Sequence, residues 1–182
     1  FGVVNVATGT VRGIQIGVVN YADDTDFSLG IVNIIRKGRV GIDVFGSEIG
    51  SITGALKHGG KYWHYIYGAA YNARLDRGGF VLGLGAHLPL RRSFYLDVDS
   101  LAEDDGAFGP MRFLAQLRTI IGRRLVGPLA VYGGLTYNAY FTNDAATEAP
   151  MKGRFVTSGT SGSVTYWRWP GMVAGLQLST GD

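Results

Sequence analysis

The chain has 182 residues, enough for one sizeable hydrophobic core, and is rich in glycine (29 residues) and in aromatic residues (12%). It contains no cysteine, which excludes disulfides and thiolate metal sites, and nothing in it calls for a cofactor or a metal. A net charge of +3, scattered without a basic stripe, speaks against a nucleic-acid partner. The mean hydropathy of +0.12, and the lack of any apolar run near the ~18 residues that a membrane helix needs, exclude a helical membrane protein.

An internal repeat occupies the start of the chain, with the pattern apolar-Gly-apolar-Val-Asn. It occurs at residues 1–5, 16–20 and 29–33, and a shortened form follows at 40–43. Polar breaks separate the units, so each unit is typical of a strand and a turn. Two architectures fit: antiparallel hairpins that continue a barrel, or a short β-solenoid with one coil per repeat. We predict hairpins, because a solenoid needs near-constant coil length and the glycine spacing shrinks (2 to 17, 17 to 30, 30 to 41).

The repeat also carries a resemblance. Residues 13–20 read G-I-Q-I-G-V-V-N, and residues 27–33 follow the same pattern with Ser28 where glutamine is expected. This resembles the repeat of bacterial surface-repeat proteins, and the remainder of the chain is similar in pattern to small Gram-negative outer-membrane barrels. The resemblance implies a surface or outer-membrane location and supplies no catalytic residues. Because Phe1 stands inside a repeat unit, we expect the natural chain to begin earlier.

Period-two, aromatic-rich segments follow at residues 80–88, 93–99, 111–121, 127–142 and 164–179. Their connections alternate in length: 89–92 and 122–125 are short, whereas 100–110 and 143–163 are long. Short turns at one end of a strand set and long loops at the other are typical of a transmembrane β-barrel.

Along these segments one face is apolar and the other is polar or small. Phe80, Leu82 and Leu84 share one face of residues 80–88, for example, and Val81 and His87 lie on the other. A soluble barrel has the same alternation with the faces exchanged. Charges deep within strands, aromatic residues near strand ends and strands of 9–11 residues favour lipid outside.

We therefore predict an all-β fold, an antiparallel transmembrane β-barrel of about 12 strands within a range of 8–14, because such barrels usually have even strand counts. Residues 1–48 are expected to form repeat hairpins that belong to this barrel. Residues 49–182 are expected to supply the C-terminal strands, with long loops at 100–110 and 143–163.

Three groups of residues are candidates for function. Opposite charges on neighbouring strands indicate a lumen cluster of Asp97, Asp99, Arg112 and Arg118. That cluster is either a charged constriction that selects solutes or a salt-bridged plug that transports nothing, and for a barrel of this size we favour the plug. Four further interior polar residues are His64, His87, Gln116 and Asn138, and an interfacial aromatic girdle is expected at Trp63, Tyr140, Phe141, Trp167 and Trp169.

Enzymatic readings are weaker. His87, near Ser93 and Asp97, could serve a membrane-embedded lipid hydrolase, but no G-x-S-x-G motif surrounds it, and an interior hydrogen-bonded histidine is the preferred interpretation. No catalytic residue is assigned. His58 and His64 are not expected to share a metal, and the acidic residues at 103–105 and the loop at 143–150 are interpreted as solvated loop tips.

The expected function is that of a non-enzymatic integral outer-membrane protein, acting as a narrow pore or as a structural or surface-display component. The alternatives are the lipid hydrolase and a surface β-solenoid adhesin. Expected partners are outer-membrane lipid, lipopolysaccharide and other envelope proteins. The long loops are expected outside the cell and the short turns in the periplasm.

Overall fold

The computed structural model describes residues 1–30, 32–104 and 110–180, in which all regular structure is β-strand. No helix in these ranges could cross a membrane. The strands are β1 (Val4–Ile16), β2 (Val19–Leu29), β3 (Val32–Ile35), β4 (Arg39–Ser47), β5 (Ser51–Gly59), β6 (Trp63–Asn72), β7 (Arg77–Pro89), β8 (Phe94–Asp104), β9 (Arg112–Val126), β10 (Leu129–Thr142), β11 (Thr157–Ser161) and β12 (Val164–Thr180).

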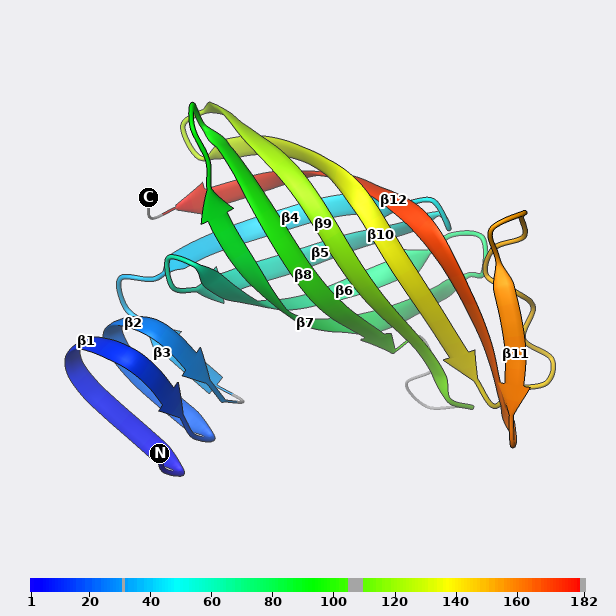
Figure 1. Ribbon diagram of the computed structural model, residues 1–182, viewed down its shortest axis with the longest axis horizontal. Coiled ribbons are helices and arrows are strands. Elements are labelled where there is room, and N and C mark those ends of the chain that lie inside the picture. Colours follow the sequence, from blue (N-terminus) through cyan, green and yellow to red (C-terminus); the bar gives the residue numbers. More distant parts are fainter. Residues whose placement is uncertain (31, 105–109, 181–182) are drawn as a thin grey trace.

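A closed antiparallel barrel is the main body of the molecule (Figure 1). β4 to β10 pair in sequence order, and β12 closes the ring by pairing with both β10 and β4. Eight strands therefore form the barrel, which confirms the all-β barrel and corrects the expected count of about 12. β11 pairs with the start of β12 only and extends outside the ring.

Two predicted connections are corrected in part. β8 continues to Asp104, so the expected loop at 100–110 begins later, and residues 105–109 lie outside the described residues. Residues 122–125 are strand, and the turn lies beyond them at Gly127, where φ is 52°. Gly122 was predicted to lie in a turn, but it lies in the strand and leaves room for the Tyr95 side chain: a Cβ there would lie 2.0 Å from the Tyr95 ring.

The N-terminal repeats form parallel coils, which corrects the predicted hairpins. β1, β2 and β3 make a separate parallel sheet in which equivalent repeat positions pair, Asn5 with Asn20 and Asn20 with Asn33. The amides form a ladder: Asn5 Nδ2 donates to Asn20 Oδ1, and Asn20 Nδ2 donates to Asn33 Oδ1, each at 2.8 Å. The coils tolerate the unequal spacing between the repeat glycines, because only the asparagines of the ladder and the repeat glycines must stay in register from one coil to the next.

The glycine of the repeat lies where one coil stacks on the next. A Cβ on Gly17 would lie 2.4 Å from Asn5 Nδ2, and one on Gly30 would lie 2.3 Å from the Gly17 carbonyl. Larger residues would separate the coils and break the ladder. The shortened fourth unit at 40–43 forms no coil and lies within β4, so residues 1–48 contain the coils and one barrel strand rather than a set of hairpins.

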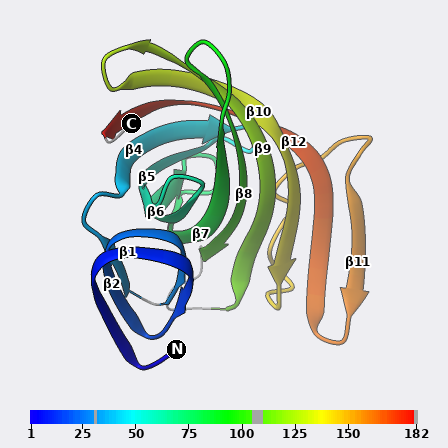
Figure 2. The ribbon, with the colours of Figure 1, turned by 60° about the vertical axis from the view of Figure 1, so that its left-hand side comes forward.

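The coils pack against the barrel wall at the end where β4 begins and β12 finishes, opposite the end that carries the long connection after β10 (Figures 1 and 2). Phe27 contacts Trp63, with ring centroids 5.3 Å apart, and the Tyr65 hydroxyl donates to the Ser28 carbonyl at 2.8 Å. Ile35 N–H also donates to His58 Nε2 at 3.3 Å, from β3 to β5. The coils are thus fixed to the barrel by both apolar and polar contacts.

The barrel wall alternates as the sequence predicted. Phe80 and Leu82 point outward and are 66% and 59% exposed, whereas Val81 between them is 2% exposed. The outward apolar side chains cover the wall from strand to strand: Val40, Ile42, Val44, Ile52, Leu56, Leu82, Val98, Leu117, Ile121, Val131, Leu135, Met172, Leu176 and Leu178. A cluster of charged groups is buried in the interior instead.

Candidate functional site

Buried charges in the barrel interior form one connected cluster, with Lys57 on β5 at its centre. The Lys57 ammonium lies 2.9 Å from Asp97 Oδ2, 3.3 Å from Asp43 Oδ2 and 3.4 Å from Asp99 Oδ2. All three aspartates are 0% exposed, and Lys57 is 2% exposed. A buried carboxylate is costly without partners, and these contacts offset the cost of burying the three aspartates.

Asp99 is the most heavily contacted of the three aspartates. Arg118 Nε donates to Asp99 Oδ2 at 2.8 Å, and His64 Nε2 lies 2.8 Å from Asp99 Oδ1. The Arg118 guanidinium also stacks 4.4 Å from the centroid of the Phe45 ring. Gly85 leaves the room for this pair, because a Cβ there would lie 2.0 Å from Asp99 Oδ1 and 2.6 Å from His64 Nε2.

The other two aspartates have their own partners. His87 Nδ1 lies 2.5 Å from Asp97 Oδ1, while Asp43 accepts hydrogen bonds from Gln177 Nε2 at 2.7 Å and from the Tyr132 hydroxyl at 3.3 Å. Three carboxylates therefore face two permanent cations, Lys57 and Arg118, with two histidines beside them. The cluster ties together β4, β5, β6, β7, β8, β9, β10 and β12.

The structure brings Asp97, Asp99 and Arg118 together as predicted but places Arg112 elsewhere. Arg112 lies near the other end of β9 and pairs with Asp144 of the loop after β10, at 2.6 Å. The four polar residues predicted to face the interior do so: His64 and His87 belong to the cluster, and Gln116 Nε2 donates to Asn138 Oδ1 at 2.7 Å. Asn138 in turn donates to Glu48 Oε1 at 3.0 Å, in a second polar layer.

The predicted aromatic girdle is mostly wrong. Tyr140 and Trp169 are 3% and 1% exposed inside the barrel, and Trp167 packs partly buried on Tyr140. Trp63 faces outward but is covered by Phe27. Of the five residues, Phe141 lies on the open outer wall, in a row with Phe113 and Tyr166, at centroid distances of 6.4 Å to each.

Sequence reasoning missed Asp43, Lys57 and Glu48. Asp43 stands where the apolar-Gly-apolar-Val-Asn pattern of the repeat expects valine. This departure was the sequence signal that the fourth unit differs in structure from the other three. Lys57 is the inward residue of an alternating segment, between outward Leu56 and His58. Glu48 gave no signal, because it reaches the interior from a turn, where Trp169 Nε1 donates to it at 2.7 Å.

A metal site is not the best account of the cluster. His64, Asp97 and Asp99 each offer one ligand atom, and these atoms lie within 4.8 Å of one another. The Lys57 ammonium and the Arg118 guanidinium already contact the same carboxylates. A metal ion would have to displace a buried ammonium, so the described geometry is that of an ion-pair network.

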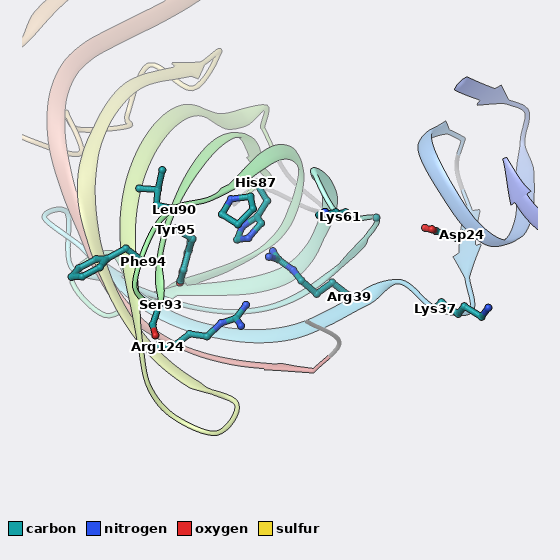
Figure 3. A pocket seen from close by; sticks show the side chains of 12 residues that line it. Asp24, Lys37, Arg39, Lys61, His87, Leu90, Ser93, Phe94, Tyr95 and Arg124 are labelled. Atoms are coloured by element: carbon teal, nitrogen blue, oxygen red, sulfur yellow. The ribbon is translucent and has the colours of Figure 1, made fainter. Parts of the chain in front are cut away.

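The hydrolase alternative requires a contact between a serine nucleophile and its histidine base, and the described residues do not show one. Asp97 and His87 are joined, as an acid and a base would be, but among the described residues no hydrogen bond joins Ser93 to His87. Figure 3 shows Ser93 away from His87, with Tyr95 between them. A serine nucleophile needs its base within hydrogen-bond reach, and this arrangement does not favour one.

Side chains fill the lumen above the cluster. An apolar layer contains Phe45, Ile66, Val81, Leu101 and Ile120, among others, and leaves a cavity of about 20 Å³, room for about one water. At the long-loop end, Leu114, Tyr140 and Trp169 form a further apolar layer, against which Met151 and Val156 of the long loop pack.

No protein-family model, no curated protein and no solved structure matches this chain.

Proposed function

We propose that this chain is a non-enzymatic structural protein of the bacterial outer membrane, with its barrel embedded in lipid and its N-terminal coils held at one end. One observation carries the proposal: large apolar side chains are exposed along the outside of the barrel, while a cluster of three aspartates, Lys57 and Arg118 is buried inside it. A soluble barrel has the opposite arrangement, because its core is apolar and its wall faces water.

The extent of the apolar wall supports lipid as its neighbour. Leu135, Met172 and Ile121 are 69%, 65% and 56% exposed, on β10, β12 and β9. Contiguous apolar patches beyond about 600 Å² are rare on monomeric soluble proteins, and here exposed apolar residues follow β4, β5, β7, β8, β9, β10 and β12. In the described residues, each of the eight barrel strands is paired with a neighbour on both sides, as a lipid environment requires.

The orientation follows from the connections. β5–β6, β7–β8 and β9–β10 are joined by short turns at the end where β4 begins and β12 finishes, and the coils lie at that end. In outer-membrane barrels the short turns are periplasmic and the long loops extracellular. The proposal therefore places the coils in the periplasm and the loop at 143–163, with β11, outside the cell.

Between a narrow pore and a structural role, the geometry favours the structural role. The ion-pair network and the two apolar layers occupy the lumen along its length. Partners in this proposal are outer-membrane lipid and lipopolysaccharide along the wall and loops, and envelope proteins at the coils, whose repeat resembles that of bacterial surface-repeat proteins.

Site-directed spin labelling tests the membrane location. The chain has no cysteine, so single cysteines introduced as Leu82→Cys and Leu117→Cys can be labelled without background. In liposomes we expect both labels to be accessible to oxygen and shielded from a water-soluble relaxation agent. A label introduced as Lys152→Cys, in the exposed long loop, serves as the water-accessible control.

Two results would oppose the proposal. If the labels at Leu82 and Leu117 were as accessible to the water-soluble agent as the loop label, the wall would not face lipid. If the folded protein gave regular single-channel conductance in planar bilayers, the lumen would be open and the pore alternative would replace the structural one.

A further inference from the structure

An open pocket of about 560 Å³ lies at the short-turn end of the barrel, between the barrel mouth and the coils (Figure 3). β4, β7, β8 and β9 supply half of its lining residues, the coils supply Asp24, and the turn between β3 and β4 supplies Lys37. Four cationic residues line it, Lys37, Arg39, Lys61 and Arg124, against one carboxylate, that of Asp24. This is a strong excess of positive charge in a concave site.

Arg39 is the residue that makes the pocket unusual. It is 8% exposed, yet no carboxylate of the described residues lies within ion-pair distance of its guanidinium. Asp97, the acidic group that acts on it most, already has its oxygens on Lys57 and His87. A buried guanidinium normally gains a carboxylate or other anion as partner, since burial of an unpaired charge is costly.

A second guanidinium faces the first. In Figure 3 the side chains of Arg39 and Arg124 point toward one another across the mouth, from β4 and β9. The charge of Arg124 acts on that of Arg39, and like charges repel. An anion between them would turn this repulsion into two attractive contacts.

We propose that this pocket binds the phosphate group of a small phosphorylated molecule or of a lipid headgroup. Arginine forks bind tetrahedral oxyanions through several parallel hydrogen bonds, and two forks from different strands suit a tetrahedral group better than one flat carboxylate. The inner wall of the pocket is formed by His87 and Tyr95, which are 3% exposed, so the phosphate enters from the coil side and stops at the ion-pair cluster.

The inference rests on the pocket itself and not on the membrane location. Even a barrel whose wall proved accessible to water would keep this site, so the two proposals fail separately.

Calorimetric titration of the folded full chain in detergent tests the site, with inorganic phosphate and a short-chain phosphatidic acid as the two probes. We expect saturable one-to-one binding of at least one probe. Arg39→Gln and Arg124→Gln should each weaken it about tenfold or more, the usual scale for a lost charge-assisted contact. Arg39→Lys, which keeps the charge and loses the fork, should fall between the native chain and Arg39→Gln.

Arg91→Gln is the matched control, because Arg91 is exposed in the β7–β8 turn at the same end, lies outside the pocket and carries the same charge. It should leave the affinity unchanged. Binding of both probes with similar affinity would identify a free phosphate group as sufficient, and binding of phosphatidic acid alone would identify a lipid headgroup. Absence of binding by either probe, or equal weakening by Arg91→Gln and Arg39→Gln, would overturn the proposal.

Discussion

Lys57 and Asp97 are 40 residues apart in the chain and meet inside the barrel, with the ammonium 2.9 Å from the carboxylate. Lys57 enters from β5 and Asp97 from β8, strands that are not neighbours in the ring. The pair therefore acts across the lumen, and the same ammonium contacts Asp43 and Asp99. The Lys57 side chain, from β5, thus balances carboxylate charge from both β4 and β8.

Replacing this ammonium should destabilise the barrel strongly. Lys57→Met leaves three buried aspartates with Arg118 as their one permanent cation among the described residues. Removing one partner of a buried ion pair costs about 3–5 kcal/mol, because the remaining charge stays desolvated and unpaired. The measurement is the free energy of unfolding in urea, followed by tryptophan fluorescence of the detergent-solubilised protein.

Lys61→Met is the control, since Lys61 is exposed at the barrel mouth and the charge change is the same. We expect it to shift the unfolding free energy by less than about 1 kcal/mol, as surface substitutions do. Equal stability of Lys57→Met and Lys61→Met would show that the network contributes little to the fold.

The inward and outward faces of the barrel could be predicted because the strand period is fixed by the backbone. Once Phe94 faces outward, Tyr95, Asp97 and Asp99 must face inward, and they do. The number of barrel strands was harder to predict from the sequence. A repeat unit has the same apolar alternation whether it pairs with its neighbour in parallel or antiparallel, and the asparagine ladder that decides for coils acts between units rather than within one.

The candidate site was predictable only where local pattern determines it. Asp99 and Arg118 lie on neighbouring strands, so their pairing follows from register. Lys57 reaches Asp97 across the lumen, and the register of adjacent strands does not contain that contact. The prediction that Trp63 belongs to an exposed girdle was wrong for a similar reason. Trp63 faces outward as a girdle residue would, but Phe27 from a distant segment covers it.

The asparagine ladder should hold the coils together independently of the barrel. Asn20→Ala removes three hydrogen bonds, those to Asn33 Oδ1, to the Leu29 carbonyl and from Asn5 Nδ2. Each such bond contributes about 1 kcal/mol, so the opening free energy of the coils should fall by roughly 2–3 kcal/mol. Hydrogen exchange of the amides of β1 and β2 measures this loss.

Asn5→Ala provides a graded comparison, because Asn5 lies in the first coil and donates two hydrogen bonds instead of taking part in three, one to the Ile16 carbonyl and one to Asn20. It should accelerate exchange less than Asn20→Ala, and neither variant should change exchange in β8 or β9. Unaltered protection of β2 in Asn20→Ala would mean that backbone stacking alone holds the coils.

A methyl group at Gly85 should disturb the ion-pair cluster. Its carbon would lie 2.0 Å from Asp99 Oδ1, well inside van der Waals contact, so Gly85→Ala must displace Asp99 from His64 or push β7 away from β8. Strain of this kind costs about 1–3 kcal/mol. Urea unfolding measures it, and Gly54→Ala is the control because a Cβ there meets nothing within 4 Å. Equal destabilisation by both substitutions would contradict the close approach at Gly85.

The long loop after β10 should loosen in acid. The hydrogen bond from Arg112 lowers the pKa of Asp144 below its usual 3.8, with further hydrogen bonds from Ala146 N–H and Thr147. Because the folded pKa is depressed, the ionised carboxylate favours the closed loop. Its contribution is complete above the ordinary value of 3.8 and is lost as the pH falls through the lower folded value.

Carbon-detected NMR of the Asp144 carboxyl gives its pKa, and ¹⁵N relaxation of the loop amides reports the accompanying loss of order. Asp144→Asn should loosen the loop at neutral pH and remove the acid transition, because its amide does not titrate and cannot form the ion pair. Arg112→Gln should return the pKa of Asp144 toward its usual value. An Asp144 carboxyl that titrates at that usual value in the native chain would mean that Arg112 does not hold the loop.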